Sequence, residues 1–160
     1  MKKLKLYLDT SVISHLHAPD TPDKMADTLL LWEEIQAGLY DVYVSPVVFE
    51  ELNKCKEPKK SIITDYLNNI KFIIIEENTE TIRLARKIIE NGILTANNFN
   101  DCRHISGAIV GDCDMIISWN FKHMANIKTI NGVKSITILE GYKDINIYTP
   151  PVLTGGKKDD

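Results

Sequence analysis

Residues 3–11 have the sequence Lys-Leu-Lys-Leu-Tyr-Leu-Asp-Thr-Ser, in which polar and apolar side chains alternate before a polar triplet begins. The alternation over residues 3–8 predicts a β-strand, because successive side chains of a strand point to opposite faces. Asp9-Thr10-Ser11 then predicts a turn or a helix cap, since short polar side chains satisfy free backbone groups there. We therefore expect the carboxylate of Asp9 at the exit of the first strand.

The rest of the chain repeats this pattern of a strand followed by a helix. Further strands are predicted at residues 40–44, 71–76, 115–118 and 135–139, the run 72–75 being apolar enough for a strand covered on both faces. Helices are predicted over 23–37, after Ser45-Pro46, over 59–67, from Asn78 or Thr79 to Asn91, and from residues 97–101 to about Gly111. Such alternation implies right-handed crossovers and a three-layer α/β sandwich with a mainly parallel central sheet.

The composition is that of a globular domain. The chain has 160 residues, 44% of them hydrophobic and 26% charged, which predicts a single domain over residues 1–153. Residues 154–160 carry no apolar side chain to anchor them, so we expect a mobile tail. The net charge of −3 argues against a protein that holds nucleic acid mainly through a basic surface. To hold an anionic substrate, a protein with this charge would need a local basic patch or a bound cation.

The apolar runs, such as 72–75 and 115–117, are far shorter than the roughly 20 residues that cross a bilayer. The basic start of the chain resembles that of a signal peptide, but Lys5 and Asp9 interrupt the apolar stretch and no cleavage site follows. We therefore expect a cytoplasmic protein with no membrane partner.

The three cysteines of the chain, Cys55, Cys102 and Cys113, form no Cys-x-x-Cys pair and cannot all be bridged. This usage suits a reducing compartment and favours free buried thiols. A zinc site made of Cys102, His104 and Cys113 is the alternative, although its spacing matches no standard ligand framework.

Four side chains are predicted to face the same end of the sheet. In an open parallel sheet, ligands bind beyond the carboxyl ends of the strands. Asp9 and Asn120 follow strands directly, Asp101 lies at or near the start of a helix, and Glu51 lies about two turns into the helix after residues 40–44. Asp114 begins the strand that precedes Asn120, so it is expected at the opposite edge. Carboxylates grouped in this way bind hard divalent cations such as Mg²⁺ or Mn²⁺, which activate water and neutralise phosphate. For Asp101 alone, a helix-capping role is an equally good interpretation.

Local sequence adds to this pattern. Four motifs occur in order: Leu-Asp-Thr-Ser-Val-Ile at 8–13, Val-Ser-Pro-Val-Val-Phe-Glu-Glu-Leu at 44–52, Asp-Cys-Arg-His-Ile-Ser-Gly-Ala at 101–108 and Asp-Met-Ile-Ile-Ser-Trp-Asn-Phe-Lys-His at 114–123. Together they resemble the PIN-domain family, whose members are mostly metal-dependent ribonucleases and include many VapC-like toxins of toxin-antitoxin pairs. The resemblance covers about residues 3–124, and residues 145–151 also resemble the ending of some bacterial members. It implies an RNA substrate, a possible antitoxin partner and a possible homodimer.

Carried over by position, the resemblance assigns the family's first three acids to Asp9, Glu51 and Asp101. It implies that Asp9 and Asp101 bind the metal directly, and that Glu51 positions the metal or its attacking water. Glu50 is the alternative to Glu51, but neighbours on a helix lie about 100° apart, so only one can point into the cleft. Asn120 stands where many members carry a fourth aspartate. Asparagine can still coordinate a metal through its carbonyl oxygen or orient a water, but it supplies no negative charge and cannot act as a base.

Four more side chains are candidates for the surroundings of the site. Ser11 could hydrogen-bond Asp9 or a ligand water, or only cap a helix. His104 could share a helical face with Asp101, or be a partly buried structural histidine. Lys122 and His123 could meet the RNA backbone, or belong to a solvated loop.

The sequence leads to a Mg²⁺- or Mn²⁺-dependent endoribonuclease as the first hypothesis for function. The second is a PIN-like module with weakened catalysis that binds protein or RNA, an interpretation that Asn120 motivates. The third is another metal phosphoesterase on a similar sheet, acting on DNA ends or small phosphates.

Overall fold

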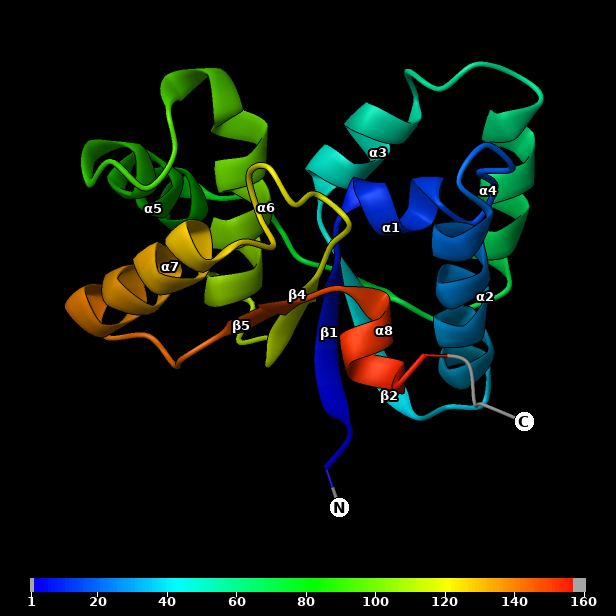
Figure 1. The fold of residues 1–160 in the computed structure, drawn as a ribbon. Coiled ribbons are helices and arrows are strands. Elements are labelled where there is room, and N and C mark those ends of the chain that lie inside the picture. Colours follow the sequence, from blue (N-terminus) through cyan, green and yellow to red (C-terminus); the bar gives the residue numbers. More distant parts are fainter. Residues whose placement is uncertain (1, 157–160) are drawn as a thin grey trace.

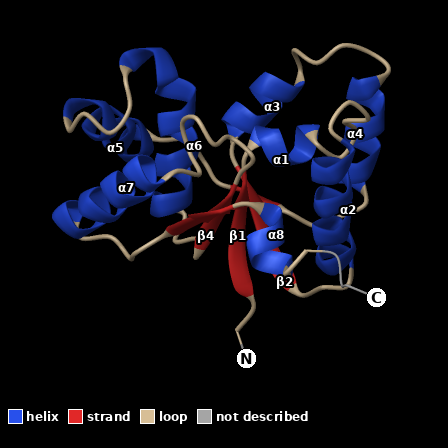
Figure 2. Ribbon diagram, viewed as in Figure 1, coloured by secondary structure: helices blue, strands red, loops and turns tan. Residues whose placement is uncertain are grey.

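A five-stranded, all-parallel sheet runs through the middle of the molecule, with helices on both sides (Figures 1 and 2). The computed structural model describes residues 2–156. The strands are β1 (Leu4–Leu8), β2 (Tyr40–Val44), β3 (Ile73–Ile74), β4 (Met115–Ile117) and β5 (Asn146–Tyr148), in the spatial order β3-β2-β1-β4-β5. This arrangement confirms the predicted α/β sandwich with its parallel central sheet.

The helices form two groups. One side of the sheet carries α1 (Thr10–Ser14), α2 (Pro22–Gln36), α3 (Pro46–Leu52) and α4 (Lys59–Asn68), and the other carries α5 (Thr79–Glu90), α6 (Phe99–Val110) and α7 (Ile127–Glu140) (Figure 1). A short 3₁₀ helix, η1 (Ala96–Asn98), leads into α6, and the last helix, α8 (Pro150–Thr154), packs against α2. The helices predicted over 23–37 and 59–67 and the strand over 40–44 are confirmed to within about one residue at each end.

The middle strand β1 is the most deeply buried part of the sheet. Leu6, Tyr7 and Leu8 have no exposed surface, and neither do Ile116 and Ile117 on the adjacent β4. Burial of a large aliphatic side chain stabilises a fold by about 1.5–3 kcal/mol, so the β1–β4 pair anchors the core. The carboxyl ends of these two strands are therefore fixed relative to each other.

The predicted strand at residues 135–139 is wrong, because these residues belong to α7. The alternation Ser-Ile-Thr-Ile-Leu favours a strand locally, but the helix has defined ends on both sides. Asn126 accepts a hydrogen bond from the Thr129 N–H at the N-terminus, and Gly141 adopts a left-handed φ of 75° just past the C-terminus. Val133, Ile136 and Thr137 then form the buried face at helical spacing.

The strand predicted over 71–76 exists only as Ile73–Ile74, and the prediction that both faces are covered is wrong. Both isoleucines are more than half exposed, because β3 lies at the edge of the sheet. The opposite edge is β5, a strand that the sequence did not predict. The strand β3 was predicted too long and β5 was not predicted, and both are edge strands. The position of an edge strand depends on the order in which distant segments pair.

The helix α8, near the end of the described residues, packs against α2. Thr154, the first residue of the expected tail, is the last residue of α8, and residues 157–160 lie outside the described part of the chain. Within that part, no helix is long and apolar enough to span a lipid bilayer.

Candidate active site

A pocket of about 240 Å³ opens beyond the carboxyl ends of β1 and β4. The chain continues from β1 toward β2 and β3 on one side, whereas β4 and β5 lie on the other, so this is the point where the strand order reverses. The pocket is lined by Asp9, Thr10, Ser11, Ser14, Glu51, Asp101, His104 and Asn120. All four residues that the sequence predicted to face one end of the sheet therefore border a single pocket.

Asp9 is the N-cap of α1 and is only 3% exposed. Its Oδ1 accepts hydrogen bonds from Ser11 Oγ at 2.5 Å and from the Val12 N–H at 3.2 Å, and its Oδ2 accepts one from Ser118 Oγ. Burial raises the pKa of the Asp9 carboxyl above its ordinary value, and the hydroxyl hydrogen bonds oppose that rise. Ser118 was missed by the sequence analysis, although it ends the predicted strand 115–118 at the same edge as Asp9.

Glu51 enters the pocket from α3, with its side chain about one-third exposed. Its Oε1 accepts hydrogen bonds from Thr10 Oγ1 at 2.8 Å and from His104 Nε2 at 2.6 Å. Burial favours the neutral acid, but His104 and Thr10 outweigh it and lower the pKa of Glu51 below its ordinary value. Glu51 is therefore held as a carboxylate.

Glu50 points elsewhere. Its Oε2 pairs with Arg103 Nη1 at 2.7 Å on the outer side of α3, and its side chain is 55% exposed. Arg103 also donates to both carboxylate oxygens of Glu77, so it ties α3 and α6 to the segment before α5. The neighbouring acids of α3 thus have different surroundings, and Glu51 is the one that borders the pocket.

Asp101 lies in the first turn of α6 and is half-buried. Burial raises the pKa of its carboxyl, and the negative charges of Asp9 and Glu51 act in the same direction. The nearby His104 and His123 act in the opposite direction. A cation bound beside Asp101 would offset the negative charges of Asp9 and Glu51.

The segment after β4 holds Asn120 in a turn. Asn120 Oδ1 accepts the His123 N–H at 3.0 Å, and the Asn120 N–H donates to Ser118 Oγ at 3.0 Å. Lys122 is exposed and His123 is half-buried, and neither lines the pocket. The structure therefore brings Asn120 to the acids and leaves Lys122 and His123 beside them.

The pocket offers oxygen ligands of the kind that Mg²⁺ prefers, but they do not form a closed cage. Among residues 2–156, no group of three His, Cys, Asp or Glu side chains is arranged to hold a metal ion. Asp9 and Glu51 each accept hydrogen bonds from protein donors. Mg²⁺ usually keeps several waters and binds one or two carboxylates with substrate phosphate. The donor set fits an open site of that type.

The alternative zinc site receives no support from the cysteines. Cys102 and Cys113 are both buried in the hydrophobic core. Burial raises the pKa of each thiol to about 12, whereas zinc binds the thiolate. Cys102 and Cys113 are therefore core residues.

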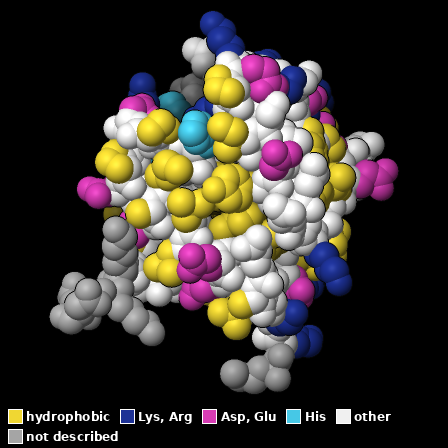
Figure 3. Space-filling view, turned by 90° about the vertical axis from the view of Figure 1, so that its right-hand side faces the viewer, with side chains coloured by type: hydrophobic (Ala, Val, Ile, Leu, Met, Phe, Trp, Pro, Cys, Tyr) yellow, Lys and Arg dark blue, Asp and Glu magenta, His cyan; other side chains and the backbone are white. Residues whose placement is uncertain are grey.

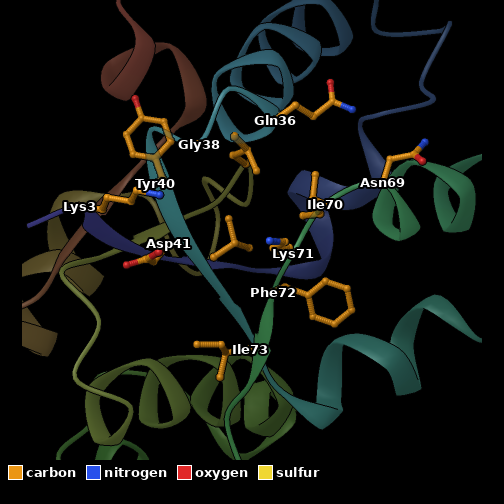
Figure 4. A pocket seen from close by; sticks show the side chains of 12 residues that line it. Lys3, Gln36, Gly38, Tyr40, Asp41, Asn69, Ile70, Lys71, Phe72 and Ile73 are labelled. Carbon is orange, nitrogen blue, oxygen red and sulfur yellow. The ribbon is translucent and has the colours of Figure 1, made fainter.

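A larger hollow of about 540 Å³ lies at the amino ends of the strands, between α2, β2 and the segment that enters β3. Figure 4 shows that it is bordered by Lys3, Asp41 and Lys71 together with the aromatic rings of Tyr40 and Phe72. It contains one carboxylate. Asp114 also lies at this end, where its Oδ2 accepts the Lys5 N–H at 2.7 Å. This hollow is larger than the pocket beyond β1 and β4, but the carboxylates converge on the smaller pocket.

Comparisons with known proteins concern the fold. No protein-family model matches the chain, and no curated protein matches it in sequence. Among solved structures, it is similar to a chain from the crystal structure of VapBC2 of Rickettsia felis bound to a DNA fragment from their promoter, with a TM-score of 0.56 and 17% identity. The match covers 91% of this chain and 98% of that one. Our chain therefore has an α/β fold like that of a protein from a VapBC complex, consistent with the PIN-like fold that its motifs predicted.

Proposed function

We propose that this protein is a metal-dependent endoribonuclease that hydrolyses RNA phosphodiester bonds with Mg²⁺ or Mn²⁺. The observation that carries the proposal is the convergence of Asp9, Glu51 and Asp101 on one pocket at the point where the strand order reverses. The similarity in fold to a chain from a VapBC complex supports the same class of protein. A cation in this pocket would also explain how a chain with a net charge of −3 engages an anionic polymer.

Asp9 and Asp101 are the proposed ligands of the cation. Ser11 and Ser118 donate to Asp9 and fix the direction of its carboxylate before any ligand arrives. When bound, the cation makes a water acidic and stabilises charge on the phosphate oxygens. Glu51 is held as a carboxylate by Thr10 and His104, so it can accept a hydrogen bond from the attacking water and orient it.

The proposal is tested by replacing Asp101 with alanine. We expect Asp101→Ala to fold normally and to lose metal-dependent cleavage of single-stranded RNA. Asp65→Ala is the matched control, because Asp65 is an exposed aspartate on α4, outside the pocket. Cleavage by a folded Asp101→Ala protein at the parent's rate would refute the assignment.

Asn120 favours a second candidate function, a PIN-like module with weakened catalysis that binds protein or RNA. Its side chain supplies no charge to the pocket, and its Oδ1 is already engaged by His123. The two functions differ in the coupling of cation and RNA. A nuclease binds RNA more tightly when Mn²⁺ is present, whereas a pure binding module has an RNA affinity that does not respond to Mn²⁺.

A protein partner is the further part of this proposal. The similar structure is of VapBC2 bound to a DNA fragment from their promoter. We propose that this protein works in the cytoplasm with an antitoxin encoded beside it. Hydrophobic side chains gather on the face that carries α2 and α4 (Figure 3), and Met25, Leu29 and Leu30 of α2 are only half-buried. Apolar surface of this kind favours protein association. Light scattering of the protein alone, and with the neighbouring gene product, distinguishes a homodimer from a mixed complex.

A further inference from the structure

A line of buried hydrogen bonds leads from the core to Glu51. Tyr7 on β1 has its hydroxyl 2.6 Å from Ser45 Oγ and 2.6 Å from His104 Nδ1. The other ring nitrogen, His104 Nε2, lies 2.6 Å from Glu51 Oε1. Tyr7 is 0% exposed, Ser45 4% and His104 2%, so water does not compete for these bonds.

The line starts and ends on the same helix. Ser45 is the N-cap residue of α3, yet its side chain makes no capping hydrogen bond, because its hydroxyl is directed to Tyr7. Glu51 lies at the other end of α3. The hydrogen bonds therefore connect the start of α3 to β1, β1 to α6, and α6 back to the end of α3. Together they hold these three elements in place relative to one another.

The chemistry of the groups gives this line a direction. The Glu51 carboxylate only accepts, so His104 Nε2 must carry a proton. With Nδ1 unprotonated, the Tyr7 hydroxyl donates to it, and the Ser45 hydroxyl donates to Tyr7. This arrangement satisfies all three bonds without placing a positive charge in the core, where an added charge is costly.

We propose that Ser45, Tyr7 and His104 form a one-directional relay of hydrogen bonds that fixes the tautomer of His104 and holds the Glu51 carboxylate in place at the pocket. Tyr7 and His104 are then positioning residues, which act through Glu51. The role in catalysis rests on the proposed function, but the relay itself is a property of the metal-free protein. Thr10, which donates to the same Oε1, steadies Glu51 from the second side.

Tyr7→Phe removes the central hydroxyl with little change in shape, and Tyr43→Phe is the matched control. Tyr43 is on β2, where it pairs with Tyr7 of β1. The Tyr43 hydroxyl makes no hydrogen bond within residues 2–156. The first readout is the ¹⁵N chemical shifts of the histidine rings in metal-free protein at neutral pH, with the His104 signals assigned by their loss in His104→Gln. We expect one tautomer with a protonated Nε2 in the parent and in Tyr43→Phe, and a mixture of tautomers in Tyr7→Phe.

The second readout is RNA cleavage. We expect Tyr7→Phe to lower kcat by about tenfold, the usual scale for loss of an outer-sphere partner, with KM and the Mn²⁺ affinity within about twofold of the parent. His104→Gln, which keeps a side-chain N–H donor, is expected to retain more activity than His104→Leu, which keeps none.

A parent ring with a protonated Nδ1, or a Tyr7→Phe protein with the parent's tautomer, would overturn the relay. So would an equal loss of kcat in Tyr7→Phe and Tyr43→Phe. A parent that cleaves no RNA would refute the proposed function instead, and the ring signals would still decide whether the relay exists.

Discussion

The side-chain oxygen of Asn120 accepts the backbone N–H of His123 at 3.0 Å. An N–H donor must meet an acceptor, so this bond fixes which end of the amide is the oxygen. The other end is an NH₂ group, which donates hydrogen bonds and does not bind metal ions. Many members of the family that the motifs resemble carry an acid at this position. Here the side chain instead closes a turn and adds no charge.

Asn120→Asp is expected to strengthen Mn²⁺ binding. The new carboxylate keeps one oxygen for the His123 N–H and gains a second, charged oxygen beside the pocket that Asn120 lines. We expect the Mn²⁺ affinity to rise by about tenfold, the scale on which neighbouring groups tune metal sites. Calorimetry with Asn131→Asp, which adds the same charge on the exposed face of α7, provides the control. An equal gain in both variants would show an effect of net charge alone.

Asp101→Asn is expected to stabilise the metal-free protein at neutral pH while abolishing cleavage. The pKa of Asp101 is raised by burial and by nearby acids, so the folded chain takes up this proton at a higher pH than the unfolded chain does. The resulting penalty is fully present above the folded-state pKa, declines as the pH falls from there toward the unfolded-state pKa, and is absent below the latter. We expect a gain of about 1 kcal/mol at neutral pH, shrinking in acid. Urea unfolding in a chelator at several pH values measures it, and a gain independent of pH would contradict the electrostatic cause.

Mn²⁺ binding is expected to weaken in mild acid. The pKa values of Asp9 and Asp101 are both raised, so these carboxylates become protonated at a higher pH than ordinary aspartates. Protonated carboxyls are poor ligands, and the metal affinity should fall as the pH approaches those raised values. Titration calorimetry over a pH series follows the effect, with Asp9→Ala expected to show no saturable binding at any pH. Unchanged binding by Asp9→Ala would exclude Asp9 as a ligand.

Thr28→Val tests how the loop after β4 is anchored. Trp119 Nε1 donates to Thr28 Oγ1 at 2.8 Å in a buried contact with α2, and the Trp119 N–H donates to Ser11 Oγ at 2.9 Å. Loss of the threonine hydroxyl leaves a buried indole N–H unpaired, which costs about 1–3 kcal/mol. Thr28→Ser keeps the hydroxyl and should lose only about 1 kcal/mol for the missing methyl group. Thermal unfolding compares the two, and a Thr28→Val protein that loses no more stability than Thr28→Ser would show that the hydroxyl does not anchor the loop.

The sequence by itself determined the class of fold and the end of the sheet at which the acids meet. Alternation over residues 3–8 and the polar cap at Asp9 are local features, and each acts over a few residues. A strand followed directly by a helix places the residue between them at the carboxyl edge, whatever the rest of the chain does. Asp9 and Asn120 follow strands directly, whereas Glu51 and Asp101 lie on helices predicted at that edge, and all four border one pocket.

Tertiary structure alone decided the edges of the sheet and the surroundings of the acids. Residues 135–139 favour a strand locally, but the caps at Asn126 and Gly141 and the packing of Val133 make a helix. The bonds of Ser118 to Asp9 and of Tyr7 to His104 join residues that are 109 and 97 positions apart. Such contacts depend on the pairing of β1 with β4 and the packing of α6, which no local pattern encodes. Composition and spacing therefore predict which acids meet, while the packing of distant segments determines what holds each of them in place.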